Sequence, residues 1–476
     1  MMSTAMVEMT PGGLGDGRVT TGSAMTDRVL GGGFPANTIN IVMGQPGTGK
    51  TIFVEQLLFA NATPERPALF LTTLSEPLSK VVRFVQEFDF YDEARIGSAV
   101  RYEDIGNELA QDGIAALVPH LREAIHTQSP ALIVIDSFKA LHDLSATATE
   151  MRQLVHELTG LLTAYDTTAF LIGEYHQEDI RHHPEFAVAD GVVELSRRPL
   201  GTRDERFFRV LKLRGSRYRE GAHAFRISSA GLEVFPRLVT PRIPTDYEPS
   251  MERLSTGNEE LDTMLQGGFL TGSSTLLVGP SGSGKTTLAL QFALEGVRRG
   301  ERAVYLNMQE NPTQLTRTVR RLAGNATTAD ALEMLYISPV ELQIDSIIVD
   351  LFRRIEGQPI QRIVVDAVGD LAAATSEPHR LHDYLYALTQ HLSVNGVTSI
   401  FTFESVGSSV TGGDLNAGPI SYMADNLLVL GMRGEETTRR TLRILKTRGS
   451  AHDSNVREIS LAAEGIRVRL PEQRAR

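Results

Sequence analysis

A phosphate-loop pattern occurs twice in this sequence, and it constrains the fold more than any other feature. Residues 44–51 and 279–286 both fit G-x-x-x-x-G-K-[ST]. In such a loop, backbone N–H groups turn inward around phosphate oxygens, and the following helix adds its positive N-terminus. A glycine-rich turn can match once by chance, but two copies, each between a strand pattern and a helix pattern, indicate nucleotide binding. The expected nucleotide-binding residues are Gly44, Gly47, Thr48, Gly49, Lys50, Thr51, Gly279, Gly282, Ser283, Gly284, Lys285 and Thr286.

The rest of the chain is duplicated at nearly the same spacing as the two loops. The recurring motifs are Thr21-Gly22 as Thr256-Gly257, Gly32-Gly33-Phe34 as Gly267-Gly268-Phe269, Ile135-Asp136 as Val365-Asp366, and Lys212 to Ser216 as Lys446 to Ser450. A repeat of this length is a duplicated domain, not a short solenoid unit. We expect a flexible segment 1–20, a first domain 21–235, a proline-rich linker 236–254, a second domain 255–470 and a polar tail 471–476.

Within each copy, short apolar and β-branched runs alternate with helical patterns, which favours a parallel sheet flanked by helices. The expected strands are 38–42, 68–72, 131–135 and 168–172 in the first copy, and 274–278, 303–306, 362–365 and 398–403 in the second. Residues 207–213 and 441–447 are expected to extend each sheet in antiparallel fashion, since no helix-length segment separates them from the next extended run. The predicted fold class is α/β, with two tandem RecA-like P-loop NTPase domains.

Two acids occupy the positions expected of magnesium ligands. Asp136 and Asp366 end buried strands about 80 residues after the phosphate loops, and such an acid commonly holds Mg²⁺ through water. We expect Mg²⁺ to accompany ATP at both sites, with the hydroxyls of Thr51 and Thr286 as further ligands. The alternative is an Asp that only caps the next helix.

Hydrolysis also needs a residue that orients the attacking water. Glu76 and Glu310 follow the second strand of each copy, at nearly the same distance from the phosphate-loop lysine, and are the candidate catalytic residues. Alternatively, each is a helix N-terminal Glu favoured by the dipole, because Pro77 and Pro312 can begin a helix nearby.

Pairs of cations alternate along the last predicted strand of each copy. Lys212 and Arg214, and likewise Lys446 and Arg448, share one face of a strand because side chains repeat with period two. A solvated face would explain either pair alone. Their repetition just before Gly-Ser suggests phosphate contacts, and since each copy has its own loop lysine, the pairs could act on a neighbouring subunit's nucleotide.

Composition narrows the remaining classes of function. The chain has no cysteine, which excludes disulfides, cysteine-based zinc clusters and thiol catalysis. The net charge of −11 and the absence of tryptophan disfavour a nucleic-acid-binding surface. No apolar run reaches the length of a membrane span, and the first residues do not resemble a signal peptide, so we expect a cytoplasmic protein. His182-His183 is expected to face solvent, without an acid cluster to complete a metal site.

These motifs together resemble the KaiC family of double-RecA ATPases. The resemblance covers about Thr20 to Val468 and rests on the T-G…G-G-F segment before each loop, the duplication, and K-x-R-G-S followed in the second copy by His452-Asp453. It implies a homohexamer of two stacked rings, ATP between subunits, and Lys-x-Arg pairs acting in trans. It also implies a timing or signalling role, with a KaiB-like or other signalling partner.

Three departures from the family pattern limit what the resemblance implies. The family has two adjacent glutamates after the second strand, the first being the usual base, whereas this chain has Ser75-Glu76 and Gln309-Glu310. The family autophosphorylates a neighbouring Ser-Thr pair, and the matching residues here are Ser421 and Tyr422, which leaves Ser421 as phosphoacceptor. The long tail that meets KaiA is absent, so KaiA is not an expected partner.

Two other functional classes stay open on the sequence alone. One is a RecA-type nucleic-acid-dependent ATPase, such as a recombinase or helicase, which shares the core fold. The other is an ATP-gated scaffold with little catalysis, which would fit the missing first glutamates.

Overall fold

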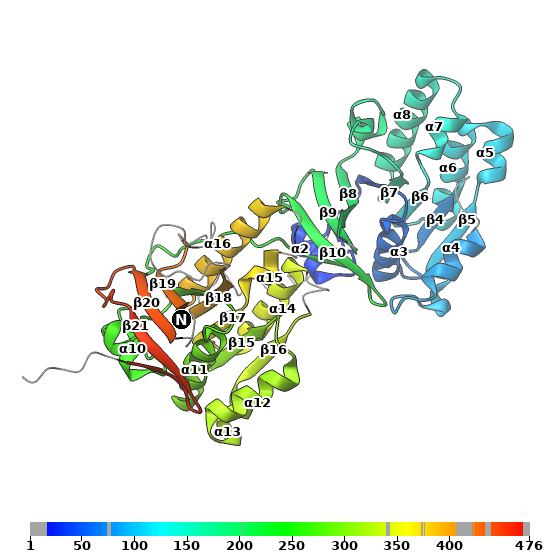
Figure 1. The fold of residues 1–476 in the computed structure, drawn as a ribbon. Coiled ribbons are helices and arrows are strands. Elements are labelled where there is room, and N and C mark those ends of the chain that lie inside the picture. Colours follow the sequence, from blue (N-terminus) through cyan, green and yellow to red (C-terminus); the bar gives the residue numbers. More distant parts are fainter. Residues whose placement is uncertain are drawn as a thin grey trace, which may run out of the picture. The chain divides into compact units, whose positions relative to one another are not determined.

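The computed structural model describes residues 17–73, 78–201, 203–338, 343–372, 375, 377–405, 421, 423–433 and 439–469. These residues form two compact units that divide between Arg237 and Leu238 (Figure 1). Glu76, Tyr422 and the two terminal segments lie outside the described residues, so the predictions made for them remain predictions. The exact domain bounds of 21–235 and 255–470 also remain a prediction.

In the described part of the first unit, nine strands form one mixed sheet in the order β11-β10-β9-β8-β3-β7-β6-β4-β5. The strands are β3 (Ile39–Gly44), β4 (Ala68–Thr72), β5 (Val100–Asp104), β6 (Leu132–Asp136), β7 (Thr168–Gly173), β8 (Gly191–Leu200), β9 (Arg203–Leu213), β10 (Ala222–Ser228) and β11 (Gly231–Phe235). In this order, the neighbours among β5, β4, β6, β7, β3 and β8 pair in parallel fashion, and the neighbours among β8, β9, β10 and β11 pair in antiparallel fashion. The predicted parallel sheet with an antiparallel extension is therefore confirmed.

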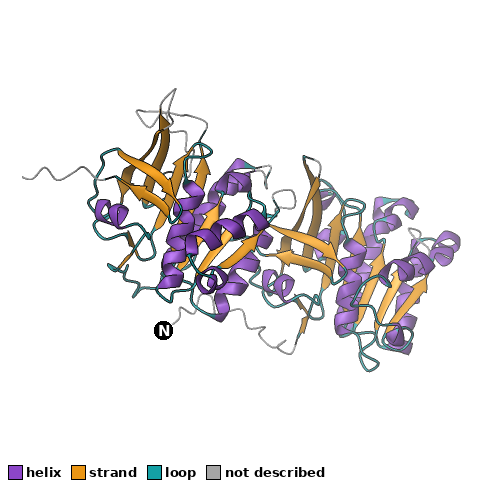
Figure 2. Ribbon diagram, turned by 60° about the horizontal axis from the view of Figure 1, so that its bottom comes forward, coloured by secondary structure: helices purple, strands orange, loops and turns teal. Residues whose placement is uncertain are grey.

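Helices cover both faces of this sheet, as Figure 2 shows. They are α2 (Ala24–Val29), α3 (Lys50–Asn61), α4 (Leu78–Val85), α5 (Gly106–Asp112), α6 (Leu117–Gln128), α7 (Ala140–Leu144), α8 (Ala148–Ala164) and α9 (Glu185–Val188), with short 3₁₀ turns η1 (Glu93–Arg95), η2 (Ile114–Ala116) and η3 (Asp179–Arg181). Val42 of β3 packs on the α3 side, whereas Ile41 packs on the side of α6 and α8. Because β3 is buried on both faces, its sequence is apolar without alternation apart from the buried Asn40.

The second unit repeats this architecture with the strand order β16-β15-β17-β18-β14-β19-β20-β21-β22 among the described residues. The strands are β14 (Ser274–Gly279), β15 (Ala303–Asn307), β16 (Glu333–Tyr336), β17 (Arg362–Asp366), β18 (Thr398–Glu404), β19 (Asn426–Arg433), β20 (Arg439–Thr447), β21 (Arg457–Ala462) and β22 (Gly465–Val468). The helices are α10 (Glu259–Met264), α11 (Lys285–Arg298), α12 (Pro312–Ala323), α13 (Ala326–Ala331), α14 (Ile344–Gly357), α15 (Val368–Ala372) and α16 (Pro378–Val394). Short two-stranded pairs, β1 (Arg18–Val19) with β2 (Phe34–Pro35) and β12 (Arg253–Leu254) with β13 (Phe269–Leu270), precede each main sheet.

The proline-rich segment before β12 has no helix or main-sheet strand, as its prolines predict. It is nevertheless held against the second unit. His391 Nε2 at the end of α16 donates to the Val239 carbonyl at 2.9 Å, and the Tyr247 hydroxyl donates to the Ser393 carbonyl at 3.2 Å. These contacts make the segment part of the second domain's surface and not a free spacer.

Over the described residues, none of the helices combines the length and apolar character needed to cross a membrane.

Candidate nucleotide site

Each phosphate loop leaves the carboxyl end of a central parallel strand, β3 or β14, and leads directly into α3 or α11. All twelve predicted loop residues therefore lie in the expected strand–loop–helix context. Gly49 and Gly284 precede the helices with φ of 98° and 107°. A Cβ at Gly49 would lie 2.7 Å from Ile227 Cδ1, and one at Gly284 would lie 3.1 Å from Ile466 Cδ1. Only glycine suits both the backbone conformation and the close approach.

The loop lysines fold back over their own loops. Lys50 Nζ donates to the Gln45 carbonyl at 3.0 Å, and Lys285 Nζ donates to the Gly279 and Pro280 carbonyls at 2.8 and 3.0 Å. Burial lowers the pKa of both lysines, and nearby carboxylates oppose that shift. Each ammonium is therefore partly desolvated at the position where a phosphate would lie.

Two of those carboxylates were missed by the sequence analysis. Glu174 follows β7 directly and Glu404 ends β18. The charge of each opposes the lowered pKa of the loop lysine in its domain more strongly than the strand-end aspartate does. The sequence spacing between these two acids equals the spacing between Asp136 and Asp366. An acid at a strand end, repeated at the spacing of a known site residue, was the available signal.

The predicted magnesium residues meet in both domains. The Thr51 hydroxyl donates to Asp136 Oδ2 at 2.9 Å, and the Thr286 hydroxyl donates to Asp366 Oδ2 at 2.8 Å. Oxygen ligands of this kind suit Mg²⁺, which keeps several of its waters and takes few protein ligands. The peptide bond after each Asp is cis. The hydroxyl and carboxylate of each pair would hold Mg²⁺ beside the phosphates.

The second site encloses its aspartate more fully than the first. Asp366 also accepts hydrogen bonds from the Tyr305 hydroxyl, at 2.5 Å, and from the Thr402 hydroxyl. The corresponding first-domain residues are Phe70 and Ile172, which carry no hydroxyl. The carboxylate of the second domain is thus oriented by three hydroxyl groups, a difference between the copies that no local motif revealed.

Glu310 lies beside this aspartate in a turn held by Asn307. Asn307 Oδ1 accepts from the backbone N–H of Glu310 at 3.0 Å, and its Nδ2 donates to the Glu310 carbonyl at 2.6 Å. Burial and the charge of Asp366 raise the pKa of the Glu310 carboxyl. Asn311, not Glu310, caps α12 by accepting from Thr313 N–H at 3.0 Å. Glu310 therefore lies directly before the N-cap of α12, and the alternative of a helix N-terminal Glu favoured by the dipole stays open.

The Lys-x-Arg pairs do not lie at the phosphate loop of their own domain. Arg214 N–H donates to the Asp190 carbonyl, whose own N–H donates to the carbonyl of Ile39, the first residue of β3. Arg448, Asp425 and Ser274 repeat this backbone ladder at the start of β14. The loops begin at Gly44 and Gly279, five residues along the same strands, which is about 16 Å away.

In both domains, the arginine of the Lys-x-Arg pair lies near an aspartate at the end of the sheet opposite the phosphate loop. Arg214 lies 3.3 Å from Asp190 Oδ1, and Arg448 lies 3.8 Å from Asp425 Oδ1. Burial and the neighbouring arginine lower the pKa of Lys212 and of Lys446, and the nearby aspartate opposes the shift.

The Gly-Ser that ends each K-x-R-G-S motif has a structural explanation. Arg18 Nη1 donates to Ser216 Oγ at 3.2 Å and to the Gly33 carbonyl at 2.8 Å. Arg253 makes the same two contacts in the second domain, to Ser450 and Gly268. In each domain, an arginine on the short two-stranded pair (Arg18 on β1, Arg253 on β12) thus joins the G-G-F segment to the serine of the K-x-R-G-S motif. The two arginines recur at the same spacing as the G-G-F segments, which was the missed signal.

A buried acid distinguishes the first domain. Glu55 on α3 is fully buried and accepts a hydrogen bond from the Tyr102 hydroxyl at 2.8 Å. Burial raises the pKa of Glu55 to about 8. Leu290 occupies the matching position on α11, so the second domain has no such group there.

We predict that Glu55 makes the first domain less stable as the pH rises. An acid whose pKa is raised by folding stabilises the native state fully below its unfolded value of 4.5, and this contribution is lost as the pH rises toward 8. Between pH 6 and 9 the loss is about 3 kcal/mol. We expect the free energy of unfolding of Glu55→Gln, measured with urea at both pH values, to fall less between them than that of the parent. Equal pH slopes for the two proteins would contradict the prediction.

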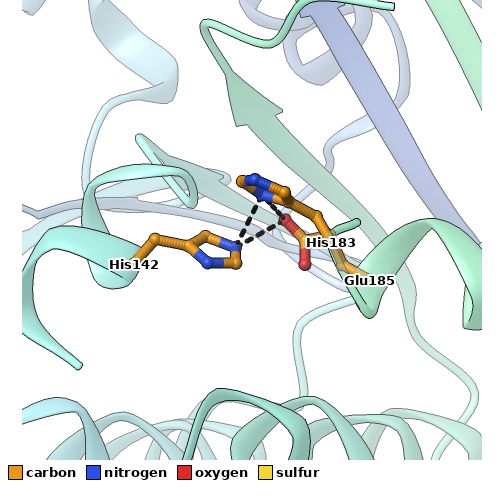
Figure 3. A group of neighbouring side chains, drawn as sticks. All are labelled: His142, His183 and Glu185. Atoms are coloured by element: carbon orange, nitrogen blue, oxygen red, sulfur yellow. Dashed lines mark hydrogen bonds and ion pairs between the residues drawn. The ribbon is translucent and has the colours of Figure 1, made fainter. Parts of the chain in front are cut away.

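The expectation for His182-His183 is partly wrong. His182 is exposed, but His183 is half-buried and packs against His142, with Glu185 completing the group (Figure 3). The acid that seemed absent is two residues away, and the other histidine comes from a different part of the chain. The His183–Glu185 spacing was visible in the sequence, whereas the contact with His142, 41 residues away, was not.

Comparison with known proteins identifies the family. The model of the KaiC ATPase family matches residues 19–239 and again 254–473. The circadian clock oscillator protein KaiC of Picosynechococcus sp. is 27% identical over 460 residues, which cover 93% of this chain and 88% of that protein. The circadian clock protein KaiC2 of Synechocystis sp. is 27% identical over 466 residues, covering 94% and 80%. With two phosphate loops, a Thr–Asp pair beside each loop and a family match over most of its length, this chain belongs to the KaiC family of ATPases.

Proposed function

We propose that this chain is an ATP-hydrolysing ring protein, a homohexamer in which each Mg²⁺-bound ATP lies between neighbouring subunits. The observation that carries the proposal is the position of the Lys-x-Arg pairs. Lys212 with Arg214, and Lys446 with Arg448, lie at the edge of the sheet about 16 Å from their own loop. Cations placed there can reach a phosphate only if another subunit presents it, which is how an arginine finger acts in trans.

The catalytic roles follow from this arrangement. Lys50 and Lys285 neutralise the phosphates, and Asp136 and Asp366 hold Mg²⁺ with the adjacent threonine hydroxyls. Glu310, with its pKa raised, orients the water in the second domain, and Glu76 has the same role in the first. The chain's own residues thus supply every part that phosphoryl transfer requires except the cations of the neighbouring subunit.

We further propose that the second ring phosphorylates Ser421 in a timing or signalling process. Ser421 is half-buried and lies beside the trans cations, since Lys446 Nζ donates to its carbonyl at 3.4 Å and to the Ala424 carbonyl at 2.6 Å. That edge is where the neighbour's γ-phosphate would arrive. The first domain has Phe186 at the matching position, so the acceptor is specific to the second ring. The circadian clock names of the relatives support the timing role.

One experiment tests both parts of this proposal. Native mass analysis of the full chain should show hexamers with ATP and Mg²⁺ and smaller species without nucleotide, because nucleotide is shared across interfaces. Phosphopeptide mapping of the same sample should place phosphate on Ser421, with about −1.5 to −2 added charge at pH 7. Ser421→Ala should assemble without phosphate. Unchanged mass with ATP would contradict the ring, and label that persists in Ser421→Ala would contradict the acceptor.

A further inference from the structure

Three ligand-type side chains converge in the first domain, on the segments that follow β6 and β7. His142 comes from α7, His183 from the turn before α9, and Glu185 from the first position of α9, as Figure 3 shows. His142 Nε2 lies 2.9 Å from Glu185 Oε1 and 3.1 Å from His183 Nδ1. The third side of the triangle, from His183 Nδ1 to Glu185 Oε1, is 3.6 Å. Two imidazole nitrogens and one carboxylate oxygen therefore face a common point.

The carboxylate of this group is buried and incompletely satisfied. Glu185 is fully buried. Its Oε1 also accepts from the Tyr175 hydroxyl at 2.6 Å. Its Oε2 is buried without a hydrogen-bond partner among the residues that the structure describes. A buried carboxylate that is not fully hydrogen-bonded is costly, and a cation bound at Oε1 would offset that cost by neutralising the charge of the whole group.

The dimensions match a small tetrahedral ion. The circle through the three atoms, with sides of 2.9, 3.1 and 3.6 Å, has a radius of about 1.9 Å. An ion displaced slightly from their plane would be about 2.0 to 2.1 Å from all three, which is the Zn–N and Zn–O bond length. We propose that His142, His183 and Glu185 form a binding site for a divalent transition-metal ion of the Zn²⁺ class, with water as the fourth ligand.

The surroundings provide access and a supporting carboxylate. The side chains of His142 and His183 are 20% and 19% exposed, so an ion and its water can enter. Asp179 Oδ1 lies 3.6 Å from His183 Nε2, on the side of the ring that faces away from the cluster. A carboxylate at that position orients a metal-binding histidine. Lys139 lies 3.0 Å from Asp179 and balances its charge.

The site would join two loops that leave neighbouring strands. His142 follows β6, which ends at Asp136, and the other two ligands follow β7. By the repeat spacing, the second domain has Ala372, Gly418 and Ile420 at the three positions. The expected stoichiometry is therefore one ion per chain. The ion would hold residues 183–185 of the first domain, which precede Phe186, the counterpart of Ser421, against α7.

Cobalt binding to the full chain tests the site. Co²⁺ in a four-coordinate nitrogen and oxygen site absorbs visible light much more strongly than Co²⁺ in an octahedral oxygen site, so nucleotide-free protein treated with chelator should gain a strong visible band at one Co²⁺ per chain. Zn²⁺ should displace it. His142→Asn and Glu185→Gln should each abolish the band and weaken Zn²⁺ binding, measured by chelator competition, by about 100-fold. His182→Asn, a change at the exposed neighbour, should leave both unchanged.

The two variants keep the test decisive. Glu185 is buried, and Glu185→Gln can destabilise the fold, whereas His142 is at the rim, and circular dichroism of His142→Asn without metal should match the parent. Thermal unfolding should shift upward with Zn²⁺ in the parent and in His182→Asn only. Absence of a strong band in the parent, or a band that survives in folded His142→Asn, would overturn the proposal.

Discussion

Two inactive variants will recover ATP hydrolysis when they assemble into one ring. The first variant carries Lys285→Ala, which removes the loop lysine, and the second carries Arg448→Ala, which removes the trans cation. Both also carry Asp136→Asn, so that turnover reports the second domain. Each variant alone should retain about one thousandth of the activity of the Asp136→Asn reference, because removing an arginine finger or a loop lysine typically costs that much or more.

In an equal mixture, about a quarter of the interfaces will join an intact loop to an intact cation, and the rate should recover to about a quarter of the reference. This outcome depends on the sheet register, which places Arg448 about 16 Å from the loop of its own domain. The matched control is a mixture in which one protein carries both Lys285→Ala and Arg448→Ala and the other is the Arg448→Ala variant, which contains no complete interface and should stay inactive. If the first mixture is no more active than its components, the cations act within their own subunit.

Glu310→Gln should nearly abolish hydrolysis in the second domain while leaving ATP binding intact. A positioned base contributes about 10²- to 10⁴-fold, and an amide cannot accept the proton. The measurement is turnover in the Asp136→Asn background, and the double variant Glu76→Gln with Glu310→Gln extends it to both rings of the otherwise unchanged chain.

The pH dependence gives an independent check on Glu310. Its pKa is raised by burial and by Asp366, so the rate should fall as the pH drops through a value above the ordinary 4.5 of a glutamate. Gln309→Ala is the matched control, because this neighbour lacks a carboxylate and should change the rate only slightly. Turnover of Glu310→Gln at the reference rate would remove Glu310 from the mechanism and favour an ATP-gated scaffold.

Short-range chemistry made part of this molecule predictable from the sequence. A phosphate loop needs glycines, lysine and threonine within one short segment, so Gly44 to Thr51 identify the site without any knowledge of the fold. Continuous apolar runs such as Leu132 to Ile135 of β6 predict strands buried on both faces. Asp136 was predicted as the partner of Thr51 because it ends a buried strand about 80 residues after the phosphate loop.

Contacts between distant segments were decided only by the tertiary structure. The sequence shows that Lys446 and Arg448 share a strand face, but the register of β20 on β19 and of β19 on β14 determines which end of the sheet they occupy. Tyr305 and Thr402 reach Asp366 from different strands, 61 and 36 residues away. His142 and His183 are 41 residues apart and meet because adjacent parallel strands deliver their loops to the same edge. No local pattern encodes such contacts, since each depends on the packing of the whole sheet.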